Sequence, residues 1–222
     1  MALTIAVEPH PLLEVGSFVI RSATPLAELP TPAAIARLTE PGAVAPLTTP
    51  DEIKTAVRDL LREGGYKPSG RSKPASEYLA AAFEKRAFPR INAFVDACNA
   101  VSLHAGLPIS LVDVDRLDQP GLTIRIAPPG TSFLFNPSGQ SIDASGLVCL
   151  YDAQGPSGTP VKDAQRTKTH DGTVAALAIV WGTRARPGWA ATTTHWYRDL
   201  VGEIAGATVE DVALDAPSSR DA

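Results

Sequence analysis

The sequence has 222 residues, of which 44% are hydrophobic and 20% are charged, and its formal net charge is −4. A chain of this length can bury a core of its own, and its slight acidity argues against a protein that coats nucleic acid non-specifically, because such a protein needs a basic surface. No apolar run reaches the roughly 18 residues of a membrane span, so we expect no membrane association.

The residue types that hold metals, cofactors and disulfides are sparse. Cys98 and Cys149 both lie in apolar surroundings, which predicts buried thiols in a reducing cytoplasm and no disulfide partner. The four histidines lack metal-ligand spacing, and neither a glycine-rich nucleotide loop nor a nucleophile elbow is present. Asp113, Asp115 and Asp118 cluster, but without the glycine and terminal glutamate of a calcium loop. We therefore expect no cofactor and no metal.

Prolines break up the beginning of the chain, which limits it to short strands, at residues 3–7 and 15–20, and loops. We expect this N-terminal segment, residues 1–47, to pack on a main domain formed by residues 48–214. Residues 215–222 are predicted to be a frayed tail.

Helix signals appear after this segment. Thr49 and Glu52 have the spacing of a capping box around Pro50, and Gly64-Gly65 is a typical helix stop. A second helix is predicted over residues 75–87. The loop between them and the residues after it are rich in basic side chains, which form either an ordinary solvated surface or one that faces phosphate. Those predicted to bind phosphate are Lys67, Arg71, Lys73 and Arg90.

The central stretch is predicted to be a helix over residues 91–105, a stop at Gly106 and a strand over residues 109–114. Polar residues are embedded among the apolar ones of this helix. Because an unpaired buried polar group costs about 1–3 kcal/mol, they must either bond to backbone or line a site. These residues are Asn92, Asp96, Asn99 and Ser102.

Short strands joined by tight turns follow and predict antiparallel pairing, at residues 122–127, 132–135 and 147–151. A long polar loop, residues 152–172, then precedes a continuous apolar strand over residues 175–181. Loops of more than about 15 residues in a compact domain are usually functional or disordered, and anchoring by core on both sides favours function. Thr194 is predicted to cap a last helix.

The block from Pro89 to Leu117 resembles the B3/B4 domain of the phenylalanyl-tRNA synthetase β subunit, in its free-standing form. The resemblance extends over about residues 50–183 and includes the segment Lys162–Thr169, Lys-Asp-Ala-Gln-Arg-Thr-Lys-Thr. It implies an α+β fold with three layers, an antiparallel β-sandwich and flanking helices. In the synthetase this domain is an editing site that hydrolyses a wrong aminoacyl ester at the 3′ end of tRNA, chiefly tyrosine on phenylalanine tRNA.

The resemblance also implies which residues form a site. The substrate pocket would be lined by Asn99, Ser102, Pro108, Ser110, Asp113 and Ile179. The catalytic residues would be Asp163, Thr167 and Lys168, with backbone amides of residues 158–162 as donors to the developing oxyanion. Each has a structural alternative, since the aspartates and threonines can instead brace backbone.

Two departures from the family pattern affect specificity. Ser110 stands where the synthetase commonly has histidine, and Ile179 stands where it has the glutamate that recognises the tyrosine hydroxyl. An unpaired phenol hydroxyl is disfavoured, so tyrosine specificity is not carried over. We expect a cytoplasmic, monomeric trans-editing deacylase acting on the aminoacyl end of misaminoacylated tRNA, and unable to charge tRNA itself. A non-catalytic module that binds tRNA or an amino-acid-like ligand, and a hydrolase of another small ester or amide, are the alternatives.

Overall fold

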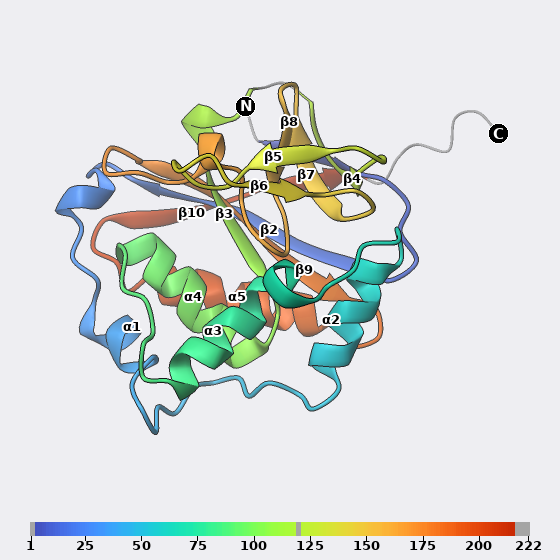
Figure 1. Cartoon of the computed structure of the whole chain (residues 1–222). Helices are drawn as coiled ribbons and strands as arrows, with labels where there is room; N and C mark the ends of the chain where they lie inside the picture. The colour runs from blue at the N-terminus through green and yellow to red at the C-terminus, as the bar shows by residue number, and fades with distance from the viewer. Residues whose placement is uncertain (1–2, 119–120, 216–222) are drawn as a thin grey trace.

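The structure is a computed structural model that describes residues 3–118 and 121–215. It has three layers, with two sheets stacked in the upper part of Figure 1 and the helices gathered below them. The first sheet has the strand order β11 (Ala213–Asp215), β1 (Thr4–Val7), β4 (Leu122–Ile126), β7 (Val148–Asp152), β8 (Gly155–Gly158). The α+β class with an antiparallel sandwich and flanking helices is confirmed, although β1 pairs in parallel with both β11 and β4.

The second sheet lies between the first sheet and the helices and is antiparallel throughout. Its order is β10 (Ala207–Asp211), β2 (Leu13–Ser22), β9 (Ala175–Thr183), β3 (Ile109–Asp113). Every residue of β9 is buried, because layers cover both of its faces, which explains its continuous apolar run. The strand β3 is also buried throughout, so its sequence does not alternate as a one-sided strand would.

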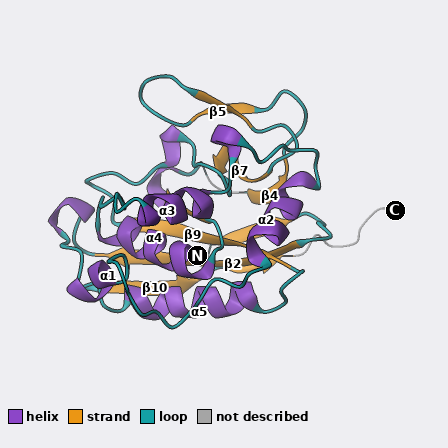
Figure 2. Cartoon of the chain, turned by 60° about the horizontal axis from the view of Figure 1, so that its bottom comes forward, coloured by secondary structure: helices purple, strands orange, loops and turns teal. Residues whose placement is uncertain are grey.

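A separate two-stranded hairpin, β5 (Ser132–Leu134) and β6 (Ser141–Asp143), stands away from the two main sheets (Figure 2). The helices are α1 (Ala33–Arg37), α2 (Ile53–Arg62), α3 (Ala75–Glu84), α4 (Ala93–Ala105) and α5 (Trp189–Val201). The helix α5 packs closely on the second sheet because Gly16 of β2 and Gly182 of β9 leave room for it. An added Cβ at Gly182 would meet the Ala190 Cβ at 2.4 Å.

The central helix ends as its sequence predicts, but it begins at Ala93, two residues later than predicted, because Asn92 caps it. The side chain of Asn92 accepts a hydrogen bond from the Val95 amide at 3.0 Å, and Gly106 ends the helix in the left-handed conformation with φ 71°. The buried Asp96 accepts from the Ile91 amide and from the Thr31 hydroxyl. This polar residue of the helix therefore braces backbone and the N-terminal segment.

Two predicted helix caps are wrong. The hydroxyl of Thr49 donates to the carbonyls of Leu103 and His104 at the end of α4, and α2 begins only at Ile53. The helix α5 begins at Trp189 after Gly188, so Thr194 lies inside it and donates to the Ala190 carbonyl. In both cases the threonine hydroxyl donates to a helix carbonyl and does not cap the first turn of the predicted helix. Local sequence does not determine which of these bonds forms.

The N-terminal strands belong to both sheets. The strand β1 lies between β11 and β4, and β2 pairs with β9 from Leu13 to Arg21. The division of the chain after residue 47 stays a prediction. The predicted frayed tail lies outside the described residues except for Asp215, which ends β11.

Candidate functional site

Hydrogen bonds within the predicted long loop fix its conformation. From the end of β8, the segment Ser157–Thr169 folds back along β3, and Val112 of β3 forms a β-bridge with Lys168. The hydroxyl of Thr167 is buried and donates to the carbonyls of Ser157 and Ala164. Side chains of the segment therefore hold it in place. For Thr167 this is the structural alternative given above, in which its hydroxyl braces backbone.

An ion pair anchors the same segment from the inside. The guanidinium of Arg166 donates to both carboxylate oxygens of Asp152, at 2.7 and 2.6 Å, and to the Ser157 hydroxyl at 2.9 Å. The Asp152 side chain is completely buried. Burial raises the pKa of Asp152, but the hydrogen bonds from Arg166 and from backbone amides outweigh it and hold the pKa below the ordinary value.

The carboxylate of Asp163 is engaged with backbone. It accepts from the amides of Leu111 and Thr159, both at 3.1 Å, which joins the segment to β3. Burial raises the pKa of Asp163, while its hydrogen bonds and the charge of Lys168 act against this rise. The amides of Val161 and Lys162 donate to the Thr159 hydroxyl. The predicted oxyanion donors at Thr159, Val161 and Lys162 are thus already engaged within the turn.

Two lysines of the segment face outward onto an aromatic ring. The ammonium of Lys162 lies 4.0 Å from the ring centroid of Phe135 and 5.6 Å from that of Tyr78. The ammonium of Lys168 lies 5.7 Å from the same Phe135 ring and donates to the Phe135 carbonyl. No carboxylate forms an ion pair with Lys162 in the described residues, so its charge is balanced mainly by the two rings and by solvent.

Neighbouring charges and burial change the acidity of these lysines. Burial lowers the pKa of Lys162, and the positive charge of Arg71 lowers it further. Burial also lowers the pKa of Lys168, the Asp163 carboxylate raises it, and Lys162 lowers it. Arg71, Lys162, Lys168 and the ring of Phe135 are called the cation cluster below.

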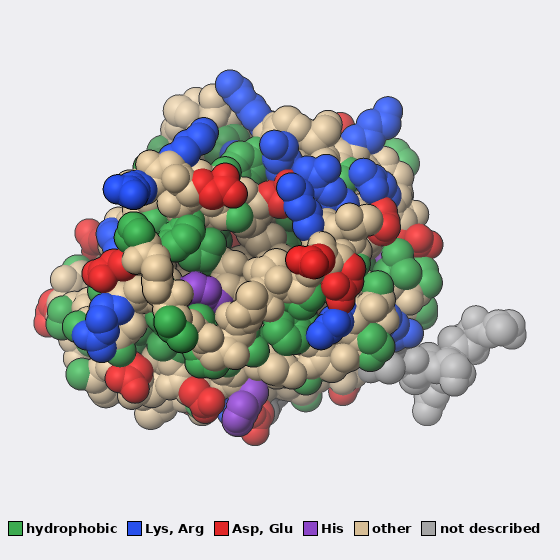
Figure 3. All heavy atoms as spheres, turned by 90° about the horizontal axis from the view of Figure 1, so that it is seen from below, with side chains coloured by type: hydrophobic (Ala, Val, Ile, Leu, Met, Phe, Trp, Pro, Cys, Tyr) green, Lys and Arg blue, Asp and Glu red, His purple; other side chains and the backbone are tan. Residues whose placement is uncertain are grey.

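A pocket of about 370 Å³ opens beside the cation cluster, and it is lined by Arg71, Ser72, Phe135, Gln140, Ser141, Ile142, Asp143 and Lys162. Asp143 is its acidic residue, and its carboxylate accepts from the Ser145 amide. Figure 3 shows Lys and Arg side chains gathered along one margin of the face seen from below. A pocket with cations and an aromatic face can hold a phosphate and stack a base.

The residues predicted to line the substrate pocket lie mostly in a closed core. Ser110 and Ile179 sit opposite each other on β3 and β9, and neither is exposed. The hydroxyl of Ser110 donates to the Thr159 carbonyl at 3.0 Å and accepts from the Trp181 indole at 2.9 Å. Pro108 is buried as well, and the buried Ser102 donates to the Leu107 carbonyl.

Asn99 and Asp113 do not line the pocket beside the cation cluster. Asn99 is half-buried on α4. Asp113 is buried and accepts from the Asp115 amide and the Thr173 hydroxyl, with the ring of His170 3.3 Å away. This matches the bracing role that was the structural alternative for Asp113. Whether any of the predicted lining residues touches a substrate stays a prediction.

The four predicted tRNA-binding residues are not gathered together. Arg71 belongs to the cation cluster, whereas Lys67 lines a shallow hollow with Arg62. Lys73 lines a different pocket between helices. Arg90 donates to the Ala36 carbonyl at 2.7 Å and so ties α1 to the start of α4.

Sequence reasoning missed Phe135, Tyr78 and the ion pair of Arg166 with Asp152. Phe135 is one of two phenylalanines in a predicted strand, and Tyr78 was only one of several residues of a predicted helix. Their common neighbour is Lys162, which the fold brings to both rings. The Lys-Asp-Ala-Gln-Arg-Thr-Lys spacing was the available signal, but it does not say which cation turns inward.

Other chemistry is limited in the described residues. Cys98 and Cys149 are buried and unpaired with each other, and burial raises the pKa of the Cys98 thiol to about 12. Within residues 3–118 and 121–215, no three His, Cys, Asp or Glu side chains come together as a metal site. No helix of that part is long and apolar enough to span a membrane.

Comparisons with known proteins agree with this fold. The family model described as "B3/4 domain" matches residues 69–185, more than half of the chain. The structure is similar to an N-terminal fragment of the phenylalanyl-tRNA synthetase β subunit from Pyrococcus horikoshii, with a TM-score of 0.52 and 12% identity. That similarity covers 99% of this chain and 55% of the fragment, so the chain spans about half the length of the solved relative.

A second solved structure, the TILS C-terminal domain, has a TM-score of 0.30 at 13% identity and covers 35% of this chain and 71% of that one. A score this low does not indicate a shared fold. A search of curated protein sequences found no match. The chain therefore belongs to the B3/4 domain family, and it shares its fold with the fragment of the phenylalanyl-tRNA synthetase β subunit.

Proposed function

We propose that this protein is a trans-editing hydrolase that removes a wrong amino acid from misaminoacylated tRNA. The observation that carries the proposal is the cation cluster. Lys162 and Arg71 line an open pocket beside the Phe135 ring, within a chain of a family related to a synthetase editing domain. A terminal phosphate would bind the cations, and a terminal base would stack on the ring.

The chemistry of such a site needs little from the protein. An aminoacyl ester is already activated, so hydrolysis requires a positioned water and positive charge near the developing oxyanion. The ammonium groups of Lys162 and Lys168 supply that charge, since the loop amides are engaged. A terminal ribose hydroxyl of the tRNA can help to position the water. Asp163 then acts as a positioning residue that fixes the segment carrying both lysines.

The substrate amino acid is proposed not to be tyrosine. Ile179 stands where the resemblance implies a glutamate that recognises the phenol hydroxyl, and it is fully buried against Ser110 in the closed region. The group that would favour tyrosine is therefore absent at this position.

One observation favours a second function, a non-catalytic module that binds tRNA or an amino-acid-like ligand. Both oxygens of Asp163 already accept a backbone amide, and Ser110 is closed off in the core, so neither side chain is held ready to activate a substrate water. This second candidate keeps the same cation cluster and the same partner but has no hydrolytic step.

The two functions are separated by following deacylation of a panel of mischarged tRNAs by the wild type, Lys162→Ala and Lys168→Ala. Lys85→Ala is the matched control, because Lys85 is an exposed lysine outside the pocket. Editing predicts hydrolysis of one class of charged tRNA, reduced at least about tenfold in the two cluster variants and unchanged in the control. Salt-dependent tRNA binding without hydrolysis supports the second function. If the protein neither binds nor hydrolyses any charged tRNA, both proposed functions are contradicted.

A further inference from the structure

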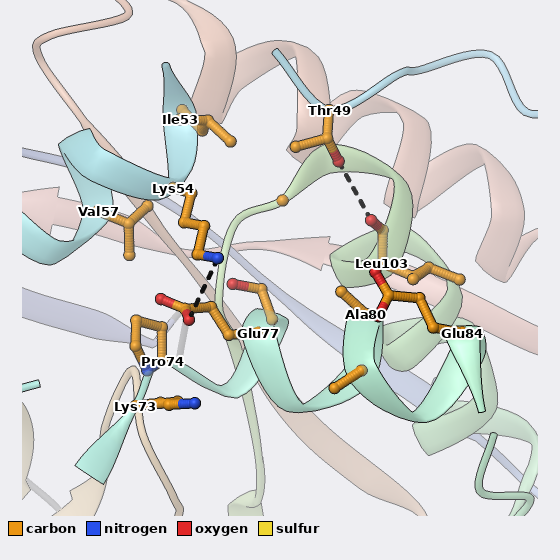
Figure 4. A pocket seen from close by; sticks show the side chains of 13 residues that line it. Thr49, Ile53, Lys54, Val57, Lys73, Pro74, Glu77, Ala80, Glu84 and Leu103 are labelled. Carbon is orange, nitrogen blue, oxygen red and sulfur yellow. Dashed lines mark hydrogen bonds and ion pairs between the residues drawn. The ribbon is translucent and has the colours of Figure 1, made fainter. Parts of the chain in front are cut away.

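A second pocket lies among the helices, away from the cation cluster. It has a volume of about 230 Å³ and is formed by α2, α3 and the end of α4 (Figure 4). It shares no lining residue with the pocket of the cation cluster and none with the predicted substrate pocket. Apart from Lys73, which the sequence predicts to bind phosphate, none of its lining residues has a part in the proposed editing site.

The middle of this helical pocket is apolar, and its charged side chains lie toward the ends. Ile53 and Val57 of α2 are buried in the core behind it, and Leu103 of α4 closes one side. Among the α3 residues that line it, Ala80 and Ala81 are small and leave a space that larger residues would fill. The composition is that of a site for an apolar body of limited size.

One end of the helical pocket is positively charged. Glu77 is neutralised by Arg58, whose guanidinium donates to both of its oxygens at 2.6 and 2.7 Å. The ammonium of Lys54 is 4.0 Å from Glu77, beyond hydrogen-bond distance, and Lys73 has no ion pair in the described part of the chain. Figure 4 shows both lysines on the same side of the pocket. Since Glu77 already pairs with Arg58, its single negative charge cannot also balance the positive charges of Lys54 and Lys73.

A polar side chain without a partner lies in the same wall. Ser76 is only 6% exposed, and its hydroxyl forms no hydrogen bond to the described residues. The Ser76 oxygen is not sealed in the core, so this hydroxyl is free to donate to a ligand atom in the pocket.

We propose that the helical pocket binds a small organic monocarboxylate with a compact apolar body. The carboxylate would meet Lys54, Lys73 and the Ser76 hydroxyl, and the apolar body would lie on Ala80 and Leu103. Because a cavity of about 150 Å³ holds benzene, 230 Å³ has room for a ring that carries a carboxylate.

Glu84 supplies selectivity against diacids. It lies across the pocket from the lysines, as Figure 4 shows, and it forms no ion pair among the described residues. A second carboxylate at the far end of a ligand would face Glu84 and be repelled.

The test uses three matched probes, para-toluate, its uncharged amide, and terephthalate, in which a second carboxylate replaces the methyl group. Binding to the tRNA-free protein is measured by calorimetry and by NMR shifts of backbone amides. We expect saturable binding of para-toluate with shifts at Ser76 and Ala80, and about tenfold weaker binding of both the amide and terephthalate.

Variants locate the site on the protein. Lys54→Gln is expected to weaken para-toluate binding about tenfold, Ala80→Leu to abolish it by filling the space, and Lys85→Gln to leave it unchanged. Absence of saturable shifts with para-toluate would overturn the proposal. Equal affinities for para-toluate and its amide, or unchanged binding by Ala80→Leu, would do the same. The tRNA assays take no part in this test, so its failure leaves the editing proposal to be judged separately.

Discussion

The segment Ser157–Thr169 has two sides that differ in how their charges are used. On the inner side, Arg166 donates to a completely buried carboxylate, to two carbonyls and to a hydroxyl. On the outer side, Lys162 rests on aromatic rings and forms no ion pair with the described residues. Cations only four residues apart thus have different tasks, one structural and one open to a ligand.

This contrast teaches that a charged residue marks a site only where the fold leaves its hydrogen-bonding capacity open. The same distinction separates the closed region around Ser110 from the cation cluster, although the sequence predicts both as one site. Substitutions can show whether a residue is structural or open to a ligand, and the largest effects are expected for the structural residues.

The largest effect is expected for Arg166→Ala. It would leave the Asp152 carboxylate buried without its partner, and we expect the free energy of unfolding to fall by about 3–5 kcal/mol in urea denaturation. Lys162→Ala is the matched variant on the outer side and should change it by less than about 1 kcal/mol. Equal losses in the two variants would contradict the contrast.

The same ion pair gives a pH dependence. The pKa of Asp152 in the folded protein lies below its ordinary value of 3.8, so the stabilisation is complete above that value and is lost as the pH falls through the folded pKa. The difference in stability between the wild type and Asp152→Asn should therefore be constant near neutral pH and shrink in acid. If the difference in stability between the wild type and Asp152→Asn is unchanged in acid, the stabilisation comes from packing and not from the ion pair.

The next effect concerns the closed region. Ser110→Ala would leave the Trp181 indole N–H and the Thr159 carbonyl unpaired in the core, and we expect a loss of about 2–4 kcal/mol of stability in urea denaturation. Ser132→Ala, exposed on β5, is the control and should be neutral. Below the unfolding transition, Ser110→Ala should keep tRNA binding and hydrolysis. Loss of hydrolysis with stability retained would place Ser110 in the site.

Much of the fold is predictable from the sequence. The stop at Gly106 and the buried strand from Ala175 depend on local chemistry, and the structure has both of them. Caps are less certain, because a hydroxyl such as that of Thr49 can serve any backbone carbonyl that tertiary packing brings near it. The parallel pairing of β1 with β11 and β4 was not predicted, since it joins segments far apart in the chain.

The candidate site is only partly predictable. Spacing identified the basic and polar segment that holds Lys168, and the residue types suggested phosphate. Which side chains turn inward depends on partners distant in sequence, such as Asp152 for Arg166 and Phe135 for Lys162. The family resemblance supplied pocket residues by position, but the bulk and bonding of Trp181 close the region around Ser110 in this chain.

A smaller effect, on binding only, is expected for Phe135→Leu. This change keeps an apolar side chain but removes the face on which a base can stack, which contributes about 1–3 kcal/mol per base. We expect about tenfold weaker binding of a short RNA with a tRNA 3′ end, measured by fluorescence anisotropy, and little change in stability. Phe88→Leu, at a half-buried ring outside the pocket, is the control. Equal losses in both variants would remove Phe135 from the site.

The smallest effect is expected for Lys162→Gln, and it is best seen in the salt dependence of binding. Removing one phosphate-facing charge should weaken tRNA binding a few-fold and reduce the slope of log affinity against log salt by about one, whereas Lys85→Gln should leave the slope unchanged. The pKa of Lys162 is lowered by burial and by Arg71, so its charge is lost at a lower pH than that of an ordinary lysine. As the pH rises, the wild-type slope should therefore fall toward that of the variant before lysines of ordinary pKa titrate. An identical change of slope for Lys85→Gln would mean that net charge alone attracts tRNA, and the outer side of the segment would then be no more a site than the inner one.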